Sequence, residues 1–122
     1  LEGLPDPDPF PAWMSEADLD VFTAAFKKSG FRGPLNRYRA QHQDFEELEA
    51  LKGKKIVQPA CFIAGEKDPV RRFVPGIDLY DRAGDHLADF RGTTIIPGVG
   101  HWVQQEAPDA TNAALEEFVR SL

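Results

Sequence analysis

The chain has 122 residues and a net charge of -6, with 14 Lys and Arg against 20 Asp and Glu. This length suits one ordinary domain, or part of a larger one, and leaves little room for two independent cores. The acidic balance, with basic residues scattered along the chain, argues against a surface for nucleic acid. No apolar run approaches the roughly 20 residues that span a bilayer, so we expect a soluble cytoplasmic protein with no membrane partner.

The first dozen residues are rich in proline. Proline fixes its own φ and has no N–H to donate, so this segment is expected to be extended. We interpret it as a linker, and a binding element is the alternative. The chain starts at Leu1 without a methionine, inside this proline-rich run, so we expect it to be a fragment of a longer protein. The prolines are Pro5, Pro7, Pro9 and Pro11.

A first helix is predicted over residues 16–29. Ser15 is a suitable N-cap because its hydroxyl can accept from the amide of Asp18, and Gly30 is a suitable stop. The apolar residues recur at helical spacing and therefore share one face, which we expect to point inward. They are Leu19, Phe22 and Phe26.

Two shorter helices are predicted next. Pro34 fits the first turn of one that carries Tyr38. Asp44 is the expected N-cap of the other, whose glutamates face solvent while its apolar residues face inward. The residues expected to face inward are Phe45, Leu48 and Leu51.

From Lys54 onward the pattern changes. An unbroken apolar run after Pro59 predicts a strand that is buried on both faces. Cys61 lies inside this run and is the chain's one cysteine, so we expect a buried, inert thiol and no internal disulfide. A second strand is predicted over residues 93–96.

Helices are expected around this second strand. Residues 76–90 form a candidate helix whose apolar positions fit the helical period only loosely. Pro108 opens a final helix with a regular apolar stripe. The order strand, helix, strand, helix requires parallel strands joined by a right-handed crossover, which places this half of the chain in an α/β sheet. The stripe consists of Leu115, Phe118, Val119 and Leu122.

Two polar residues follow the predicted strands, Asp68 after the first and His101 after the second. Both loops emerge at the carboxyl edge of a parallel sheet, where open α/β sheets bind ligands. A carboxylate there can accept from one imidazole nitrogen and stabilise the imidazolium formed when the other nitrogen takes a proton. The pattern therefore favours a base with its orienting acid. The structural alternative, an exposed loop histidine and an aspartate that opens the turn at Pro69, stays open.

No nucleophile accompanies this pair. In such an architecture the nucleophile sits on a sharp turn from strand to helix, flanked by small residues, and the sequence contains no such motif. No group of His, Cys and Asp has metal-ligand spacing either, so we expect no metal. The side chains that could serve as nucleophiles lie on helix ends, inside a strand or at the chain end: Ser15, Ser29, Cys61 and Ser121.

Three segments, "SGFRGPLNRYR", "FIAGEKD" and "GVGHWVQQEAPDATNAALEEFV", together resemble the C-terminal part of an epoxide hydrolase of the α/β-hydrolase fold. The resemblance covers essentially the whole chain, and the first segment is the specific one. It implies an α/β fold class in which residues 1–53 form the rear of a helical cap. Residues 54–122 would then supply the last two parallel strands and helices of the hydrolase core.

The resemblance also implies roles for individual residues. Asp68 corresponds to the triad acid, His101 to the base that activates water, and Tyr38 to the cap tyrosine that protonates the epoxide oxygen. An aspartate from an earlier part of such an enzyme opens the epoxide and forms an ester, which water then hydrolyses to a diol. No cofactor is needed. Trp102 and Phe10 are candidates to line the substrate pocket, with simple packing as the alternative.

The sequence departs from the family pattern at two points. Arg37 stands where an aromatic residue commonly precedes the cap tyrosine, and no second cap tyrosine is evident, since Tyr80 lies in a different segment. The expected partners are a small apolar epoxide and an N-terminal segment of the enzyme that carries the nucleophile, and a homodimer stays open. The alternatives are a dehalogenase or esterase of the same fold, which the Tyr38 motif argues against, and a non-catalytic interaction fragment.

Overall fold

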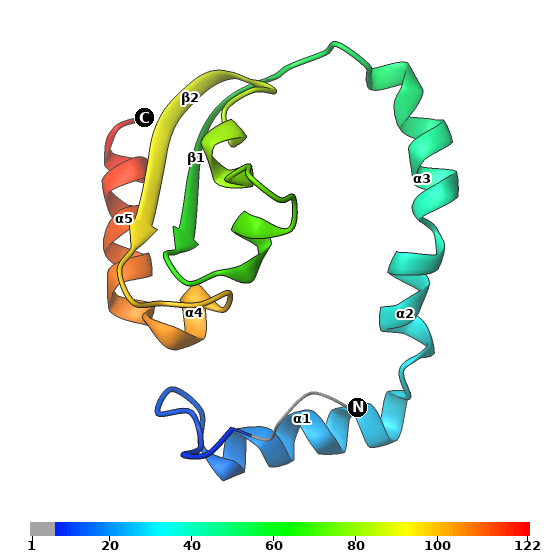
Figure 1. Ribbon diagram of the computed structural model, residues 1–122, viewed down its shortest axis with the longest axis vertical. Helices are drawn as coiled ribbons and strands as arrows, with labels where there is room; N and C mark the ends of the chain where they lie inside the picture. Colours follow the sequence, from blue (N-terminus) through cyan, green and yellow to red (C-terminus); the bar gives the residue numbers. More distant parts are fainter. Residues whose placement is uncertain (1–6) are drawn as a thin grey trace. The chain divides into compact units, whose positions relative to one another are not determined.

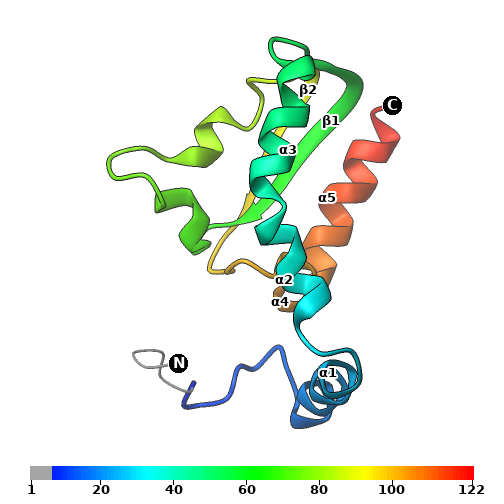
Figure 2. The same ribbon diagram turned by 90° about the vertical axis from the view of Figure 1, so that its right-hand side faces the viewer.

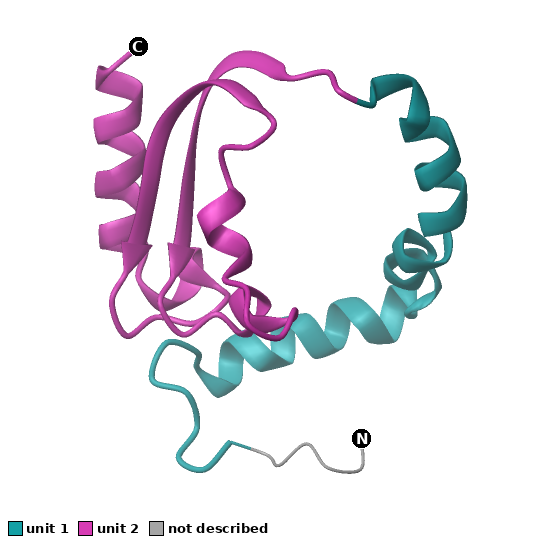
Figure 3. Cartoon of the chain, turned by 45° about the horizontal axis from the view of Figure 1, so that its top comes forward, with its two compact units in different colours: residues 1–52 teal, residues 53–122 magenta. Residues whose placement is uncertain are grey.

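A computed structural model describes residues 7–122. Residues 1–6, and with them the expectation for Pro5, lie outside the described part. The chain divides into two units, residues 1–52 and 53–122, which are coloured separately in Figure 3. Among the described residues, no helix combines the length and the apolar character that crossing a membrane would need.

The first unit opens with α1 (Glu16–Ser29), which has the predicted bounds. Ser15 caps it as predicted: its hydroxyl accepts from the amide of Asp18 at 3.2 Å, and the Asp18 carboxylate accepts in return from the amide of Ser15 at 2.9 Å. Gly30 ends the helix with φ +66°, a conformation that side chains disfavour. The start and stop of this helix are therefore determined locally.

The helices α2 (Arg32–Arg39) and α3 (Gln41–Leu48) follow, and a 3₁₀ turn (Glu49–Leu51) completes the unit. The prediction that Asp44 caps α3 is wrong. Ala40 ends α2 and begins α3, and its carbonyl accepts from the amide of Asp44 at 2.9 Å, so Asp44 already lies within the first turn. The chain runs from one helix to the next across one residue, which leaves no room for a separate cap.

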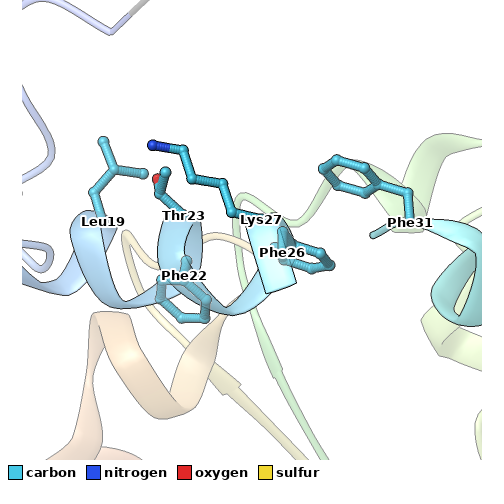
Figure 4. A pocket seen from close by; sticks show the side chains of 6 residues that line it. All are labelled: Leu19, Phe22, Thr23, Phe26, Lys27 and Phe31. Carbon is cyan, nitrogen blue, oxygen red and sulfur yellow. The ribbon is translucent and has the colours of Figure 1, made fainter. Parts of the chain in front are cut away.

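The inward-facing residues predicted for the third helix are exposed in this unit, with Phe45 at 76%. The predicted face of α1 does gather on one side, where Figure 4 shows it lining an apolar hollow together with Phe31. Phe26 and Phe31 stack there with ring centroids 4.7 Å apart. None of the described residues of this unit is buried, because no second layer covers these faces within the unit.

The second unit contains two strands, β1 (Ile56–Gly65) and β2 (Leu87–Ile96), which pair in parallel as predicted. Both begin earlier than their apolar runs. Pro59 lies inside β1 rather than before it, at an irregularity in the pairing register. A strand tolerates proline, which lacks the N–H donor, at such an irregularity or along an unpaired edge.

The predicted helix over residues 76–90 is wrong. The connection from β1 to β2 consists of two short 3₁₀ turns, Pro69–Arg72 and Leu79–Arg82, and the chain from Leu87 onward belongs to β2. Asp78 caps the second turn by accepting from the amide of Tyr80 at 3.0 Å. The loose periodicity of this segment reflects a compact irregular connection rather than a helix.

Two helices close the second unit, α4 (Val103–Glu106), which the sequence did not indicate, and α5 (Pro108–Arg120). The α5 helix lies on one side of the strands and the connecting segment on the other (Figures 1 and 2). Its stripe is only partly covered, since Phe118 is half-buried while Val119 is 63% exposed. The exposed members of the predicted stripe are Leu115, Val119 and Leu122.

The core is small and lies near the carboxyl ends of the strands. The buried apolar residues of the described chain are Ala64, Ile96 and Val103. Among residues 7–122 the prediction of strands buried on both faces is wrong, because residues 56–59 of β1 are exposed and each strand has one strand neighbour there. Cys61 is half-buried rather than fully buried.

Candidate active site

The loops that follow the two strands touch each other. The amide of Lys67 donates to the carbonyl of Val99 at 2.8 Å, which joins the loop after β1 to the loop after β2. A Cβ at Gly65 would collide with the carbonyl oxygens of Val99 and Gly100, so only glycine permits this approach. The close contact of the loops brings the residues beyond them together.

Asp68 and His101 meet at this edge. A carboxylate oxygen of Asp68, Oδ2, lies 2.8 Å from Nδ1 of His101, which confirms the hydrogen bond predicted from the parallel strands. The Asp68 side chain is 4% exposed and that of His101 is 49% exposed. The acid is therefore buried behind the histidine, while the ring itself reaches the surface of the unit.

The carboxylate of Asp68 has two further donors. Its other oxygen, Oδ1, accepts from the amide of Val70 at 2.9 Å, which caps the 3₁₀ turn at Pro69. Oδ2 also accepts from the hydroxyl of Tyr80. The turn-opening role and the histidine-orienting role, which the sequence presented as alternatives, thus belong to the same side chain.

These hydrogen bonds decide the charge of Asp68. Burial raises the pKa of its carboxyl, but the hydrogen bonds from Tyr80, Val70 and His101 outweigh burial and hold the pKa below its usual value. Burial, followed by the hydrogen bond to Asp68, raises the pKa of Tyr80, so its phenol stays protonated. An ionised carboxylate can only accept, so Nδ1 of His101 carries the proton and Nε2 is left as the basic nitrogen.

Glu106 shapes the loop around His101. Its carboxylate accepts from the amide of Gly100 at 2.6 Å and from the amide of Trp102 at 3.0 Å, the residues on either side of the histidine. The Trp102 ring stands edge-on to the imidazole, with centroids 5.0 Å apart. The sequence did not point to Glu106, because its role depends on α4.

The remaining predicted site residues have different settings. Trp102 is 54% exposed beside His101, which leaves its part in a pocket a prediction. Tyr38, on α2, and Phe10 belong to the first unit and are 65% and 40% exposed. The place of Tyr38 and Phe10 beside His101 also stays a prediction. Within residues 7–122, no three His, Cys, Asp or Glu side chains form a group that could hold a metal ion.

Known proteins resemble the chain along nearly its whole length. Epoxide hydrolase B of Mycobacterium tuberculosis is 42% identical over 116 residues, which are 95% of this chain and 32% of that protein. Epoxide hydrolase A of the same species is 40% identical over 122 residues, 100% of this chain and 37% of the relative. The chain thus spans about a third of the length of these curated relatives. No protein-family model matches it.

Solved structures agree with the sequence relatives. The crystal structure of epoxide hydrolase A from Mycobacterium thermoresistibile superimposes with a TM-score of 0.84 at 40% identity, over 95% of this chain and 35% of that one. Potato (Solanum tuberosum) epoxide hydrolase I gives a TM-score of 0.88 at 30% identity, over 100% of this chain and 39% of the potato chain. The parallel strands and their polar carboxyl edge are therefore part of an α/β-hydrolase fold. Within that fold the chain corresponds to a fragment of an epoxide hydrolase, as its three motifs predicted.

Proposed function

We propose that this chain supplies the water-activating pair of an epoxide hydrolase, with Asp68 as the orienting acid and His101 as the base. The observation that carries the proposal is the hydrogen bond between the buried carboxylate and Nδ1, which leaves Nε2 of the exposed ring free to take a proton. The names of the relatives point to the same reaction class.

The proposed reaction has two steps. A carboxylate nucleophile attacks one epoxide carbon and the C–O bond breaks, while the phenol of Tyr38 donates its proton to the departing oxygen. A phenol is a competent proton donor to an alkoxide, because an alkoxide is a much stronger base than a phenolate. His101 then takes a proton from water as the oxygen adds to the ester carbonyl. Collapse of that intermediate releases the diol and regenerates the carboxylate, and the proton taken up by His101 returns through solvent to the Tyr38 phenolate, so both side chains regain their starting states.

The nucleophile is proposed to come from outside these 122 residues. Cys61 lies on β1 in the middle of the strand, and Ser121 follows the end of α5, so neither occupies a strand-to-helix elbow. The relatives are about three times as long as this chain, which leaves ample sequence for a segment that carries an aspartate.

Replacing Tyr38 with phenylalanine in the whole enzyme tests the reaction class. We expect epoxide opening to slow by about 10²-fold or more, because the leaving oxygen loses its proton donor. Pre-steady-state formation of the ester from a terminal epoxide is the measurement, and circular dichroism should show an unchanged fold. Parent activity that favours a haloalkane or an aryl ester over the epoxide, or a phenylalanine variant as fast as the parent, would contradict the proposal.

We also propose that the chain requires further strands of the same enzyme in order to fold. Each strand leaves one edge without a strand neighbour within residues 7–122, and two-stranded sheets are marginal in water. Several large apolar side chains are exposed, and each forgoes about 1.5–3 kcal/mol of burial free energy. Examples in the second unit are Ile56, Val57, Phe73 and Val119.

The 122 residues expressed alone are therefore expected to aggregate or to melt without cooperativity. Co-expression with the nucleophile-bearing segment should yield a soluble complex that unfolds in one transition. Calorimetry and analytical ultracentrifugation make the comparison. A monodisperse 13.6 kDa monomer with a sharp melting transition would contradict this expectation and favour an independent interaction module.

A further inference from the structure

Tyr80 provides a side-chain hydrogen bond to Asp68 that the proposed mechanism does not use. Its hydroxyl donates to Oδ2, the same oxygen that accepts from Nδ1 of His101. A hydroxyl bond to an ionised carboxylate is charge-assisted and roughly twice as strong as a neutral one. The negative charge of one oxygen is thus shared between a phenol and an imidazole.

Tyr80 is held in place from several sides. Its ring packs edge-on against Phe62 of β1, with centroids 4.8 Å apart and planes 74° apart. The guanidinium of Arg71 lies 5.8 Å from the ring centroid and pairs with the carboxylate of Asp78. Asp78 in turn accepts from the backbone amide of Tyr80. The connection between the strands is therefore built so that this hydroxyl reaches Asp68.

We propose that Tyr80 is a positioning residue that fixes the Asp68 carboxylate and takes up part of its negative charge, and so sets the pH range in which His101 activates water. The inference rests on the proposed function and deepens it. It concerns the hydrolysis step alone, because ester formation does not use the histidine.

The sign of the effect follows from the shared oxygen. A carboxylate stabilises an adjacent imidazolium, and a second donor on the same oxygen weakens that stabilisation. Removing the Tyr80 hydroxyl leaves Oδ2 to His101 alone and favours the imidazolium, which cannot act as a base. The acidic limb of the hydrolysis profile must then move to higher pH.

Other charged side chains lie near this hydrogen bond. They are the same in the parent and in a variant that lacks only the Tyr80 hydroxyl. Some belong to the connection between the strands, and Glu106 comes from α4, where it binds the amides on either side of His101. Glu66 follows β1 and accepts from the amide of Gly98 in the loop after β2. Within the connection between the strands, Arg71 and Asp78 are the charged groups that act on Tyr80, and that ion pair is in turn influenced by Glu66, Arg72 and Asp81.

The test uses Tyr80→Phe in the whole enzyme, with ester formation and ester hydrolysis resolved by single-turnover kinetics across pH. Phenylalanine keeps the ring against Phe62 and removes only the donor. We expect the rate of ester formation to stay within about two-fold of the parent. We expect the acidic limb of hydrolysis to move up by about half a pH unit to one unit.

Two comparisons separate positioning from simple packing. Phe62→Leu weakens the ring contact but keeps the hydroxyl, so it should lower the melting temperature without moving the acidic limb. Replacing Tyr80 with 3-fluorotyrosine makes the phenol a stronger donor, so the limb should move to lower pH. This second replacement decides the question even if the phenylalanine variant fails to fold.

An acidic limb that is the same with tyrosine, phenylalanine and 3-fluorotyrosine at position 80 would overturn the inference, as would an equal loss in both steps. Neither result would contradict the proposed function. That proposal is tested separately, by whether the ester accumulates when His101 itself is replaced. Opposite shifts with phenylalanine and 3-fluorotyrosine would establish that the hydroxyl acts through Asp68.

Discussion

Replacing His101 with glutamine is expected to let the enzyme open one epoxide and then stop. The nucleophilic aspartate is ionised without help, so the ester should form at close to the parent rate. Water, in contrast, has lost its base, and general-base assistance contributes about 10²- to 10⁴-fold. Glutamine keeps a polar side chain of moderate size beside Asp68 but has no basic nitrogen. The alkylated enzyme should therefore accumulate.

Mass spectrometry of the variant after brief exposure to an epoxide measures this directly. The expected product is an intact protein heavier by one substrate, with the added mass on an aspartate outside residues 1–122. His42, an exposed histidine on α3, offers a matched control, and His42→Gln should turn over like the parent without an adduct. Full turnover by His101→Gln, or no adduct at all, would contradict the proposed roles.

Asp68→Asn should slow ester hydrolysis nearly as much as His101→Gln does, although the side chain keeps its size. The carboxylate accepts on both oxygens, from Val70 on one and from Tyr80 and His101 on the other. An amide has one accepting oxygen. If that oxygen stays with Val70, the amide nitrogen faces His101 and forces the ring to accept at Nδ1 and carry its proton at Nε2. The basic nitrogen is then lost, and a comparable replacement of a triad acid costs about 10⁴-fold in kcat.

The rate of ester hydrolysis measures this effect, and ester formation serves as the internal control. Chemical denaturation at different pH values adds a second readout. Because the pKa of Asp68 is lowered in the folded state, its charge stabilises the protein at pH values above the ordinary 3.8, and this contribution is lost as the pH falls further. The stability gap between parent and variant should therefore narrow in acid. Unchanged hydrolysis in Asp68→Asn would remove the orienting role.

The sequence by itself determined the features that depend on local chemistry and on general rules of chain connection. The α1 helix begins at the predicted Ser15 cap and ends before Gly30, because caps act within a few residues of the helix ends. The pairing of Asp68 with His101 was also predictable, although 33 residues separate them. Two parallel strands must end at one edge of a sheet, whatever the details of the connection between them.

Only the tertiary structure decided what lies between and around these residues. Residues 76–90 have no regular periodicity, and their turns are held by side-chain contacts such as the ion pair of Arg71 with Asp78. The hydroxyl of Tyr80 reaches Asp68 through this irregular connection, so no spacing in the sequence predicted that contact. The prediction that the strands are buried on both faces was wrong for a related reason. An apolar pattern shows that a strand face needs a covering layer, but which residues cover it depends on segments distant in the sequence. For β1 the described residues supply only part of that layer.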